Sequence, residues 1–194
     1  GKVLKNGYRG IIAEAESALS KLDVSDSDYV SRSNFLYAVI ESCEAVIAYA
    51  RRYAALAKEL AQKEKSPERK RELEIISKNC VRVPEFGATS FYEACQAFWF
   101  IQLLLQIESS GHSISPGRFD QYMYPYYKKD IENGVITKEK AQELLDCIWV
   151  KLNDINKVRD AASADGFAGY GMFQNLIVGG QNIHGMDATN DLSY

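Results

Sequence analysis

Apolar residues recur at helical spacing along the first two-thirds of the chain. Residues 8–21 show this spacing, which predicts a helix that ends in the turn-rich residues 23–28. The same spacing then continues over many turns between residues 29 and 64, which predicts one long helix. The apolar stripe of this long helix consists of Leu36, Val39, Ile40, Cys43, Val46, Ile47, Ala50 and Ala54.

Polar residues that favour helix starts divide the following hundred residues. Ser66 before Pro67 is typical of a helix start, and Ser90 with Glu93 has the spacing of a capping box. Thr137 caps a later element in the same way. The predicted helices run over residues 66–79, 90–107, 119–133 and 137–158.

The pattern changes after residue 160. Residues 161–170 are small and glycine-containing, which predicts an irregular loop, whereas residues 173–180 alternate and predict a buried strand. A lone strand leaves backbone groups unpaired, at about 1–3 kcal/mol for each buried group. Either a second strand lies within the chain, or the partner strands belong to other polypeptide. We therefore expect a mainly α fold with one or two strands, forming a single partial domain over 1–194 that is helical over 1–160 and a loop and strand over 161–194.

Composition and charge argue against several classes of partner. Of the 194 residues, 46% are hydrophobic and 25% charged, and the net charge is −3. No broad basic face is therefore offered to nucleic acid or to an anionic membrane. The most apolar run, residues 98–107, is too short to span a bilayer and contains Gln102 and Gln106. We expect neither nucleic acid nor membrane as a partner.

The four cysteines indicate a reducing compartment. They are Cys43, Cys80, Cys95 and Cys147, and none has the spacing of a CxxC motif. We interpret them as buried, reduced thiols, which are typical of a cytoplasmic protein. No signal peptide is visible, although the chain begins with Gly1 and not with methionine.

Residues alone suggest only a weak candidate site. His112 and Ser113 lie in a turn-rich segment after an apolar helix, where loops often carry binding groups. Asp120 and Asp130 are a candidate carboxylate pair, although Asp120 also lies beside Arg118 and a structural ion pair with it is the commoner outcome. Tyrosines cluster around residue 125, which more often indicates a core or an interface than a site. No metal site is predicted, since the two histidines are far apart.

Two longer segments carry a resemblance to a known family. Residues 111–122, GHSISPGRFDQY, resemble the GHSxSxGRxDQY segment of the glycyl-radical enzymes. Residues 179–194 resemble the GGxxxxGxDAxNxLSY segment of the same family, and residues 141–151 its AxELLDCxWxK helix. The branch that this chain most resembles contains the glycerol and propane-1,2-diol dehydratases and choline trimethylamine-lyase, with pyruvate formate-lyase more distant.

The resemblance implies a ten-stranded α/β barrel surrounded by helices. It also implies chemistry in which a cysteine thiyl radical abstracts hydrogen from the substrate and a backbone glycyl radical regenerates that thiyl. A separate radical S-adenosylmethionine activase installs the glycyl radical, so this chain needs no cofactor of its own. The GCxE-type and RVxGY-type loops that carry these radicals do not occur in the sequence. The resemblance therefore places the chain in the N-terminal half of the family, and we expect no turnover from it alone.

The resemblance also implies where substrate is bound. His112 and Ser113 match the position at which diol dehydratases line their pocket, and Tyr170 matches an aromatic wall of that pocket. A phenol can hydrogen-bond a diol, whereas an apolar ring suits a trimethylammonium group. The implied parent enzyme is an anaerobic, cytoplasmic lyase, commonly a homodimer, that removes water from a small diol. The alternatives are a choline-type carbon–nitrogen lyase and a non-catalytic helical interaction module derived from the family.

Overall fold

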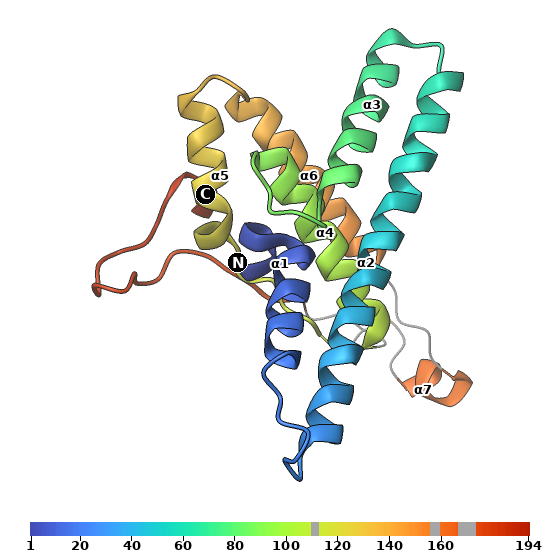
Figure 1. Cartoon of the computed structure of the whole chain (residues 1–194). Helices are drawn as coiled ribbons and strands as arrows, with labels where there is room; N and C mark the ends of the chain where they lie inside the picture. Colours follow the sequence, from blue (N-terminus) through green and yellow to red (C-terminus); the bar gives the residue numbers. More distant parts are fainter. Residues whose placement is uncertain (110–112, 156–159, 167–173) are drawn as a thin grey trace. The chain divides into compact units, whose positions relative to one another are not determined.

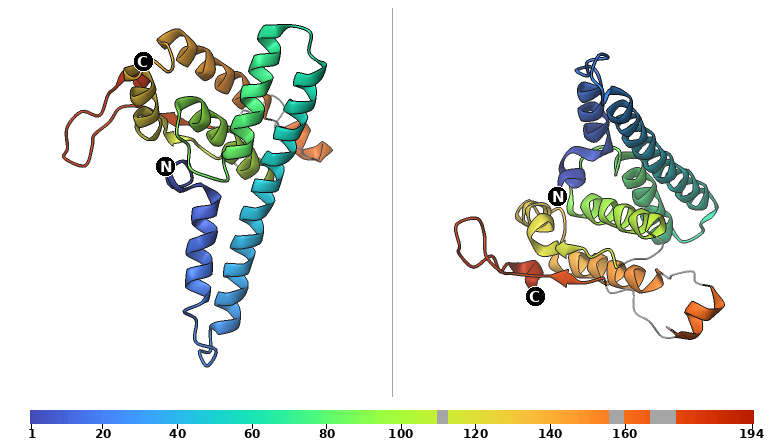
Figure 2. Two further views of the ribbon diagram at one scale, coloured as in Figure 1. Left: turned by 45° about the horizontal axis from the view of Figure 1, so that its top comes forward. Right: turned by 90° about the horizontal axis from the view of Figure 1, so that it is seen from below.

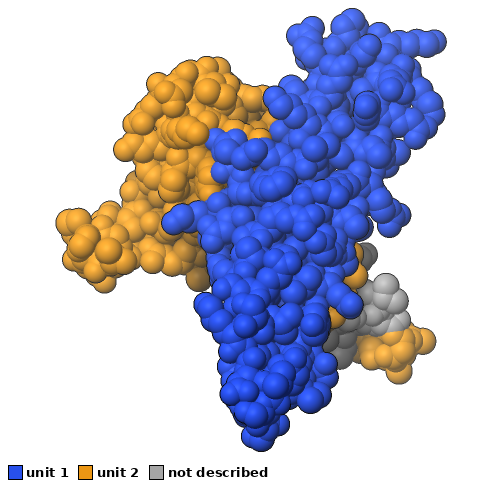
Figure 3. Space-filling view, in the orientation of Figure 1, with its two compact units in different colours: residues 1–89 blue, residues 90–194 orange. Residues whose placement is uncertain are grey.

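The computed structural model describes residues 1–109, 113–155, 160–166 and 174–194. The chain divides into two compact units, Gly1–Thr89 and Ser90–Tyr194, which Figure 3 shows in two colours. Across the described residues, no helix combines the length and the apolar character needed to cross a membrane.

Unit 1 is built on one long helix. Helix α2 (Tyr29–Lys63) contacts α1 (Lys2–Leu19) through its first half and α3 (Pro67–Arg82) through its second half, as Figure 1 shows. Ile12 of α1 packs with Cys43 and Ile47 of α2 in a buried cluster. The predicted long helix is confirmed, and its buried positions continue toward α3 as small side chains: Ala50, Ala54, Ala57 and Ala61.

Helix α1 starts earlier than the apolar spacing predicted. Its first turn lies before Gly7, a kink with a φ of 67°, and the regular stripe begins only after that kink. The backbone on either side of Gly7 is bonded to the segment after α3, with Tyr8 N donating to Pro84 O (2.9 Å) and Ala88 N to Leu4 O (2.8 Å). A Cβ at Gly7 would lie 2.2 Å from Glu85 O, so only glycine permits this approach.

A buried carboxylate joins the three parts of unit 1. Glu85 accepts from Arg51 of α2 at 2.7 and 2.8 Å and from Nε of Arg9 of α1 at 3.0 Å. Its side chain is almost entirely buried, while both arginines are partly exposed. The carboxylate thus fixes the segment after α3 against both neighbouring helices.

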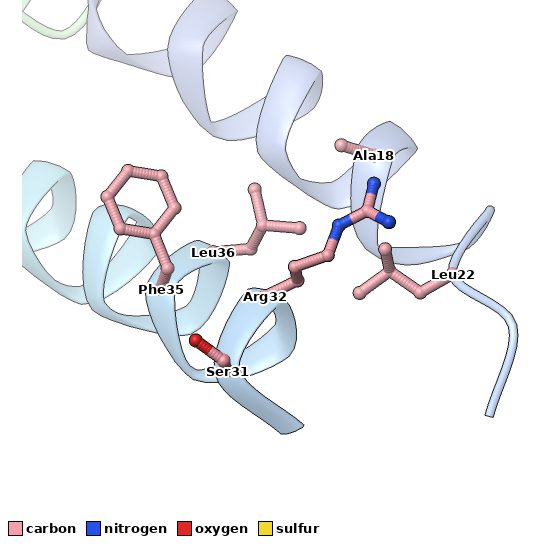
Figure 4. A pocket seen from close by; sticks show the side chains of 6 residues that line it. All are labelled: Ala18, Leu22, Ser31, Arg32, Phe35 and Leu36. Atoms are coloured by element: carbon pink, nitrogen blue, oxygen red, sulfur yellow. The ribbon is translucent and has the colours of Figure 1, made fainter. Parts of the chain in front are cut away.

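One cavity of about 410 Å³ lies where α1 and α2 meet at the turn between them (Figure 4). Its wall is mainly apolar, and its one charged residue, Arg32, is paired with Asp26 at 3.4 Å. The lining holds no acid–base or nucleophilic pair, which makes it a poor candidate for a catalytic site. The lining residues are Ala18, Leu22, Ser31, Arg32, Phe35 and Leu36.

Unit 2 packs two helices against a strongly apolar third. Helix α4 (Phe91–Glu108) contacts α5 (Phe119–Glu132) and α6 (Lys138–Asp154). Aromatic rings fill this core, with Phe119 edge-on to Phe98 at 5.0 Å and Phe91 edge-on to Tyr127 at 5.6 Å. The predicted caps are confirmed in both units: Ser66, Ser90 and Thr137 each accept from the backbone N–H three residues later.

The structure corrects the loop prediction for residues 161–166, while residues 167–170 of that predicted loop lie outside the described residues. A short helix, α7 (Ala161–Gly166), forms where a loop was expected. Asp160 explains it, because its carboxylate accepts from the backbone and the hydroxyl of Ser163 (3.0 and 2.6 Å), as a helix-capping residue does.

The predicted strand has a partner within the chain. Strand β2 (Leu176–Ile177) is shorter than expected and pairs in parallel with β1 (Gly117–Arg118), so that Gly117 is opposite Leu176. Of the two alternatives for this strand, a second strand within the chain therefore holds at one edge. After β2, residues 181–187 form a loop that stands away from α5 and α6 in both views of Figure 2, and the 3₁₀ helix η1 (Asp191–Ser193) returns to α5.

The cysteines are only partly as expected. Cys43, Cys80 and Cys95 are buried free thiols, and burial raises the pKa of Cys80 to about 12. Cys147 is exposed, which corrects the expectation that all four are buried. It lies beside the buried stripe of α6, which consists of Ala141, Leu144 and Ile148.

Candidate functional site

The candidate site lies on the segment that leads from α4 into β1. Ser113 is exposed and has a φ of 53°, within the left-handed region that costs a residue other than glycine about 1–2 kcal/mol. No hydrogen bond to another described residue occupies its hydroxyl. His112 and Tyr170, the other predicted contacts, lie outside the described residues.

Hydrogen bonds from two other parts of the chain hold the residues just after Ser113. Ser115 Oγ accepts from the backbone N–H of Asn175 (3.2 Å), and the carbonyl of Pro116 accepts from the Tyr122 hydroxyl (3.0 Å). Because these contacts come from the β2 region and from α5, they hold the segment in one path. A strained residue persists only where its surroundings determine its conformation in this way.

Arg118 and Asp120 bind the glycine turn that follows β2. Arg118 donates to the carbonyls of Gly179 (3.0 Å) and Gln181 (2.9 Å), and Asp120 accepts from the backbone N–H of Gly179 (2.6 Å). The predicted Arg118–Asp120 ion pair is therefore wrong, since both side chains are used on the turn instead. We call this arrangement the turn clasp: Arg118, Asp120 and Gly179.

Asp120 is an ionised group in a buried position. Its exposed fraction is 0%, and besides Gly179 it accepts from the hydroxyl of Ser193 in η1. Burial acts to raise the pKa of Asp120, but the hydrogen bonds from Gly179 and Ser193 outweigh it and hold the pKa below its ordinary value. Its second oxygen, Oδ1, has no partner among the described residues.

Asp120 and Asp130 do not form a carboxylate pair for acid–base chemistry. Asp130 is also buried, but it accepts from the backbone N–H of Phe91 (2.7 Å) at the start of α4. Each carboxylate therefore satisfies a buried backbone donor at a different place. Tyr127 is buried, packs edge-on against Phe91 and stacks with the partly buried Tyr124, which agrees with the prediction of a core or an interface for this member of the tyrosine cluster.

The polar residues of the 111–122 segment thus have two kinds of role. Those after residue 117 bind backbone groups of the chain itself, and Gln121 continues the pattern by donating to Ala188 O (2.8 Å). Ser113 is free of such bonds among the described residues. His184, the second histidine, is exposed on the 181–187 loop. Within the described ranges no group of three metal-ligating side chains occurs.

Sequence reasoning missed the buried amides that hold this segment. Gln102 and Gln106 were noted only as polar interruptions of an apolar run, yet both are buried on α4. Two glutamines at helical spacing within an apolar run could have indicated buried amides that hydrogen-bond another segment, because a buried amide requires hydrogen-bond partners.

Comparison with known proteins identifies the family. The profile described as "PFL-like: Pyruvate formate lyase-like" matches residues 1–194. The chain belongs to this family of glycyl-radical enzymes, and the resemblance seen in its two long segments is confirmed. Those two segments, 111–122 and 179–194, are the ones that the turn clasp joins.

Solved structures and curated relatives agree with this placement. A structure on 1,2-propanediol dehydration in Roseburia inulinivorans is 60% identical with a TM-score of 0.95, over 98% of this chain and 24% of that one. The glycerol-bound glycerol dehydratase of Clostridium butyricum is 58% identical with a TM-score of 0.93, over 100% and 24%. Isethionate sulfite-lyase of Oleidesulfovibrio alaskensis is 44% identical, over 100% and 24%. The chain thus spans about a quarter of the length of these relatives.

Proposed function

We propose that this chain is part of a glycyl-radical dehydratase that removes water from a small diol. In this proposal Ser113 hydrogen-bonds a substrate hydroxyl, with His112 beside it and Tyr170 as a wall of the pocket. The cysteine and glycine that carry the radicals lie outside these residues, and a radical S-adenosylmethionine activase installs the glycyl radical. The chain alone is then inactive.

The observation that carries the proposal is the graded similarity to enzymes of different substrates. Identity is 60% and 58% to chains that act on or bind propane-1,2-diol and glycerol, but 44% to one that acts on a sulfonate. Relatives that share a reaction type differ mainly in the groups that contact the substrate. The difference in identity therefore favours a diol over isethionate.

The geometry of Ser113 supports the same substrate class. Its exposed hydroxyl can both donate to and accept from a substrate OH, and the strained φ of 53° fixes where that hydroxyl is presented. An uncharged hydroxyl suits a diol, whereas binding a sulfonate calls for cationic or multiple N–H donors.

Exposed apolar residues at the end of β2 support a role within a larger protein. Ile177 and Val178 are 52% and 44% exposed, although they lie in and just after a strand. Large apolar side chains on a strand are normally covered by packing. We propose that β1 and β2 are two strands of the ten-stranded barrel. A free-standing helical module, the rival reading, is expected to present polar side chains there.

The test is an anaerobic assay of the full-length protein that contains this chain, activated by its activase. We expect aldehyde formation from propane-1,2-diol or glycerol, and an increase in KM of about tenfold or more for Ser113→Ala, as expected for a lost substrate hydrogen bond. Ser17→Ala, at an exposed position of α1 in unit 1, is the control, and its KM should not change. Release of trimethylamine from choline, or of sulfite from isethionate, with no aldehyde formed from propane-1,2-diol or glycerol, would refute the diol.

A further inference from the structure

Helix α4 carries two glutamines on its buried face. Gln102 and Gln106 are 3% and 2% exposed, one turn apart, in a helix otherwise rich in phenylalanine, leucine and isoleucine. A buried amide without partners is strongly unfavourable, so each of these positions requires hydrogen bonds that an apolar residue would not need. Departures of this kind from the apolar pattern occur mainly at functional sites.

Both glutamines donate to the same backbone carbonyl. Nε2 of Gln102 lies 2.6 Å from Ile114 O, and Nε2 of Gln106 lies 3.4 Å from it. A carbonyl oxygen has two lone pairs, and here both are used. Ile114 directly follows Ser113. The two glutamines of α4 therefore set the orientation of the peptide group between Ile114 and Ser115.

A third glutamine ties this pair to the rest of unit 2. Gln102 Nε2 also donates to Gln174 Oε1 (2.8 Å), and Gln174 Nε2 donates to Leu152 O at the end of α6 (3.0 Å). Since Leu152 offers an acceptor only, Gln174 must present its Nε2 to Leu152 and its Oε1 to Gln102. We call Gln102, Gln106 and Gln174 the glutamine clamp.

We propose that the glutamine clamp is a set of positioning residues for the substrate site. By fixing the Ile114 carbonyl, Gln102 and Gln106 hold Ser113 in its left-handed conformation and so place its hydroxyl for substrate binding. The contacts at Ser115 and Pro116 hold the segment further on, whereas among the described residues the side-chain hydrogen bonds to Ile114, which directly follows Ser113, come from the clamp. This inference rests on the proposed role of Ser113.

Gln102→Met in the activated full-length protein tests the clamp, because methionine has a similar volume and no donor. We expect KM for the diol to rise about tenfold with a smaller change in kcat, because the substitution removes the hydrogen bonds of Gln102 to Ile114 O and to Gln174 Oε1. Amide exchange in the peptide that covers residues 113–118 should accelerate by a similar factor. Gln96→Met, on the same helix but outside the clamp, is the matched control and should leave both unchanged.

A double-variant cycle separates positioning from simple loss of stability. If Gln102 acts through Ser113, then Gln102→Met in a Ser113→Ala background should raise KM much less than it does alone. Equal effects in both backgrounds would overturn the proposal, as would unchanged KM and exchange in Gln102→Met. Should that variant not fold, Gln106→Met, which removes the longer contact, is measured in the same way.

The exchange measurement needs no substrate, so it distinguishes the two ways of failing. If the enzyme uses another substrate, the proposed diol activity fails while faster exchange at 113–118 still supports the clamp. If diol turnover is confirmed and exchange is unchanged, the clamp fails by itself.

Discussion

Asp120→Ala removes the acceptor at the centre of the turn clasp. In the structure the carboxylate binds the N–H of Gly179 at 2.6 Å and the hydroxyl of Ser193. After the substitution the Gly179 N–H remains buried with no acceptor from Asp120, whereas Ser193 is only partly buried and can turn to water. We therefore expect the segment around Gly179 to open more easily, while the helices stay folded.

The size of the effect follows from the charge of the acceptor. A hydrogen bond to a charged group contributes about 1.5–3 kcal/mol, and a buried donor left unpaired costs about 1–3 kcal/mol. The two figures both include the loss of the Gly179–Asp120 hydrogen bond, so they are not added in full, and the bond from Ser193 contributes less. We therefore expect the free energy of local opening around Gly179 to fall by about 2–4 kcal/mol. At about 1.4 kcal/mol for each factor of ten, the Gly179 amide should exchange about 30-fold to several hundred-fold faster.

The assay is amide hydrogen exchange with Asp130→Ala as the matched control. Asp130 is a buried carboxylate on the same helix, but its N–H partner is Phe91. Asp130→Ala should therefore accelerate exchange near residue 91 and leave residues 176–193 unchanged, the reverse of Asp120→Ala. If the two variants give the same exchange pattern, or if Gly179 keeps its protection in Asp120→Ala, the assignment of the clasp is wrong.

Three further results are expected. Gly7→Ala should lower the free energy of unfolding by about 3–5 kcal/mol, because the left-handed φ is strained for alanine and its Cβ would displace Glu85 O. Gly134→Ala also has a positive φ but open space around its Cβ, so it should lower the free energy by only about 1–2 kcal/mol. Equal losses of the two variants in urea unfolding would contradict the close approach at Gly7. Glu85→Gln should cost about 1–3 kcal/mol, since Arg51 loses its charged acceptor, and a melting temperature equal to wild type would refute this. The pKa of Asp120 is lower in the folded than in the unfolded chain, so the carboxylate stabilises the fold fully above about pH 4 and this stabilisation is lost as the pH falls through the folded pKa. Asp120→Asn should remove this acid-side dependence of stability, measured from unfolding curves at several pH values.

The helices were predictable because their determinants are local. Apolar spacing located α2, and side-chain caps located the starts of α3, α4 and α6, where Ser66, Ser90 and Thr137 each accept from a backbone N–H. The same reasoning missed the first turn of α1, because Gly7 breaks the period there and its conformation depends on Glu85, far along the chain.

The strands and the site depended on contacts that no local pattern records. Residues 117 and 118 lie outside every predicted helix and strand, and they become β1 because Leu176 and Ile177 lie beside them. Arg118 and Asp120 are close in sequence and of opposite charge, which favoured an ion pair, but the turn at Gly179 offers both of them backbone partners. Motif resemblance located this segment without revealing what its polar residues bind.

The turn clasp also sets an order of events during synthesis of the chain. Helices α1 to α3 contact sequence neighbours, whereas Asp120 must wait for Gly179, 59 residues later, and for Ser193, 73 residues later. At about 5–20 residues per second, the ribosome takes about 3–12 s to reach Gly179 and about 4–15 s to reach Ser193. During this interval the Asp120 carboxylate is solvated and the 113–118 segment lacks its later neighbours. Unit 1 can therefore be complete while the 113–118 segment is still unassembled.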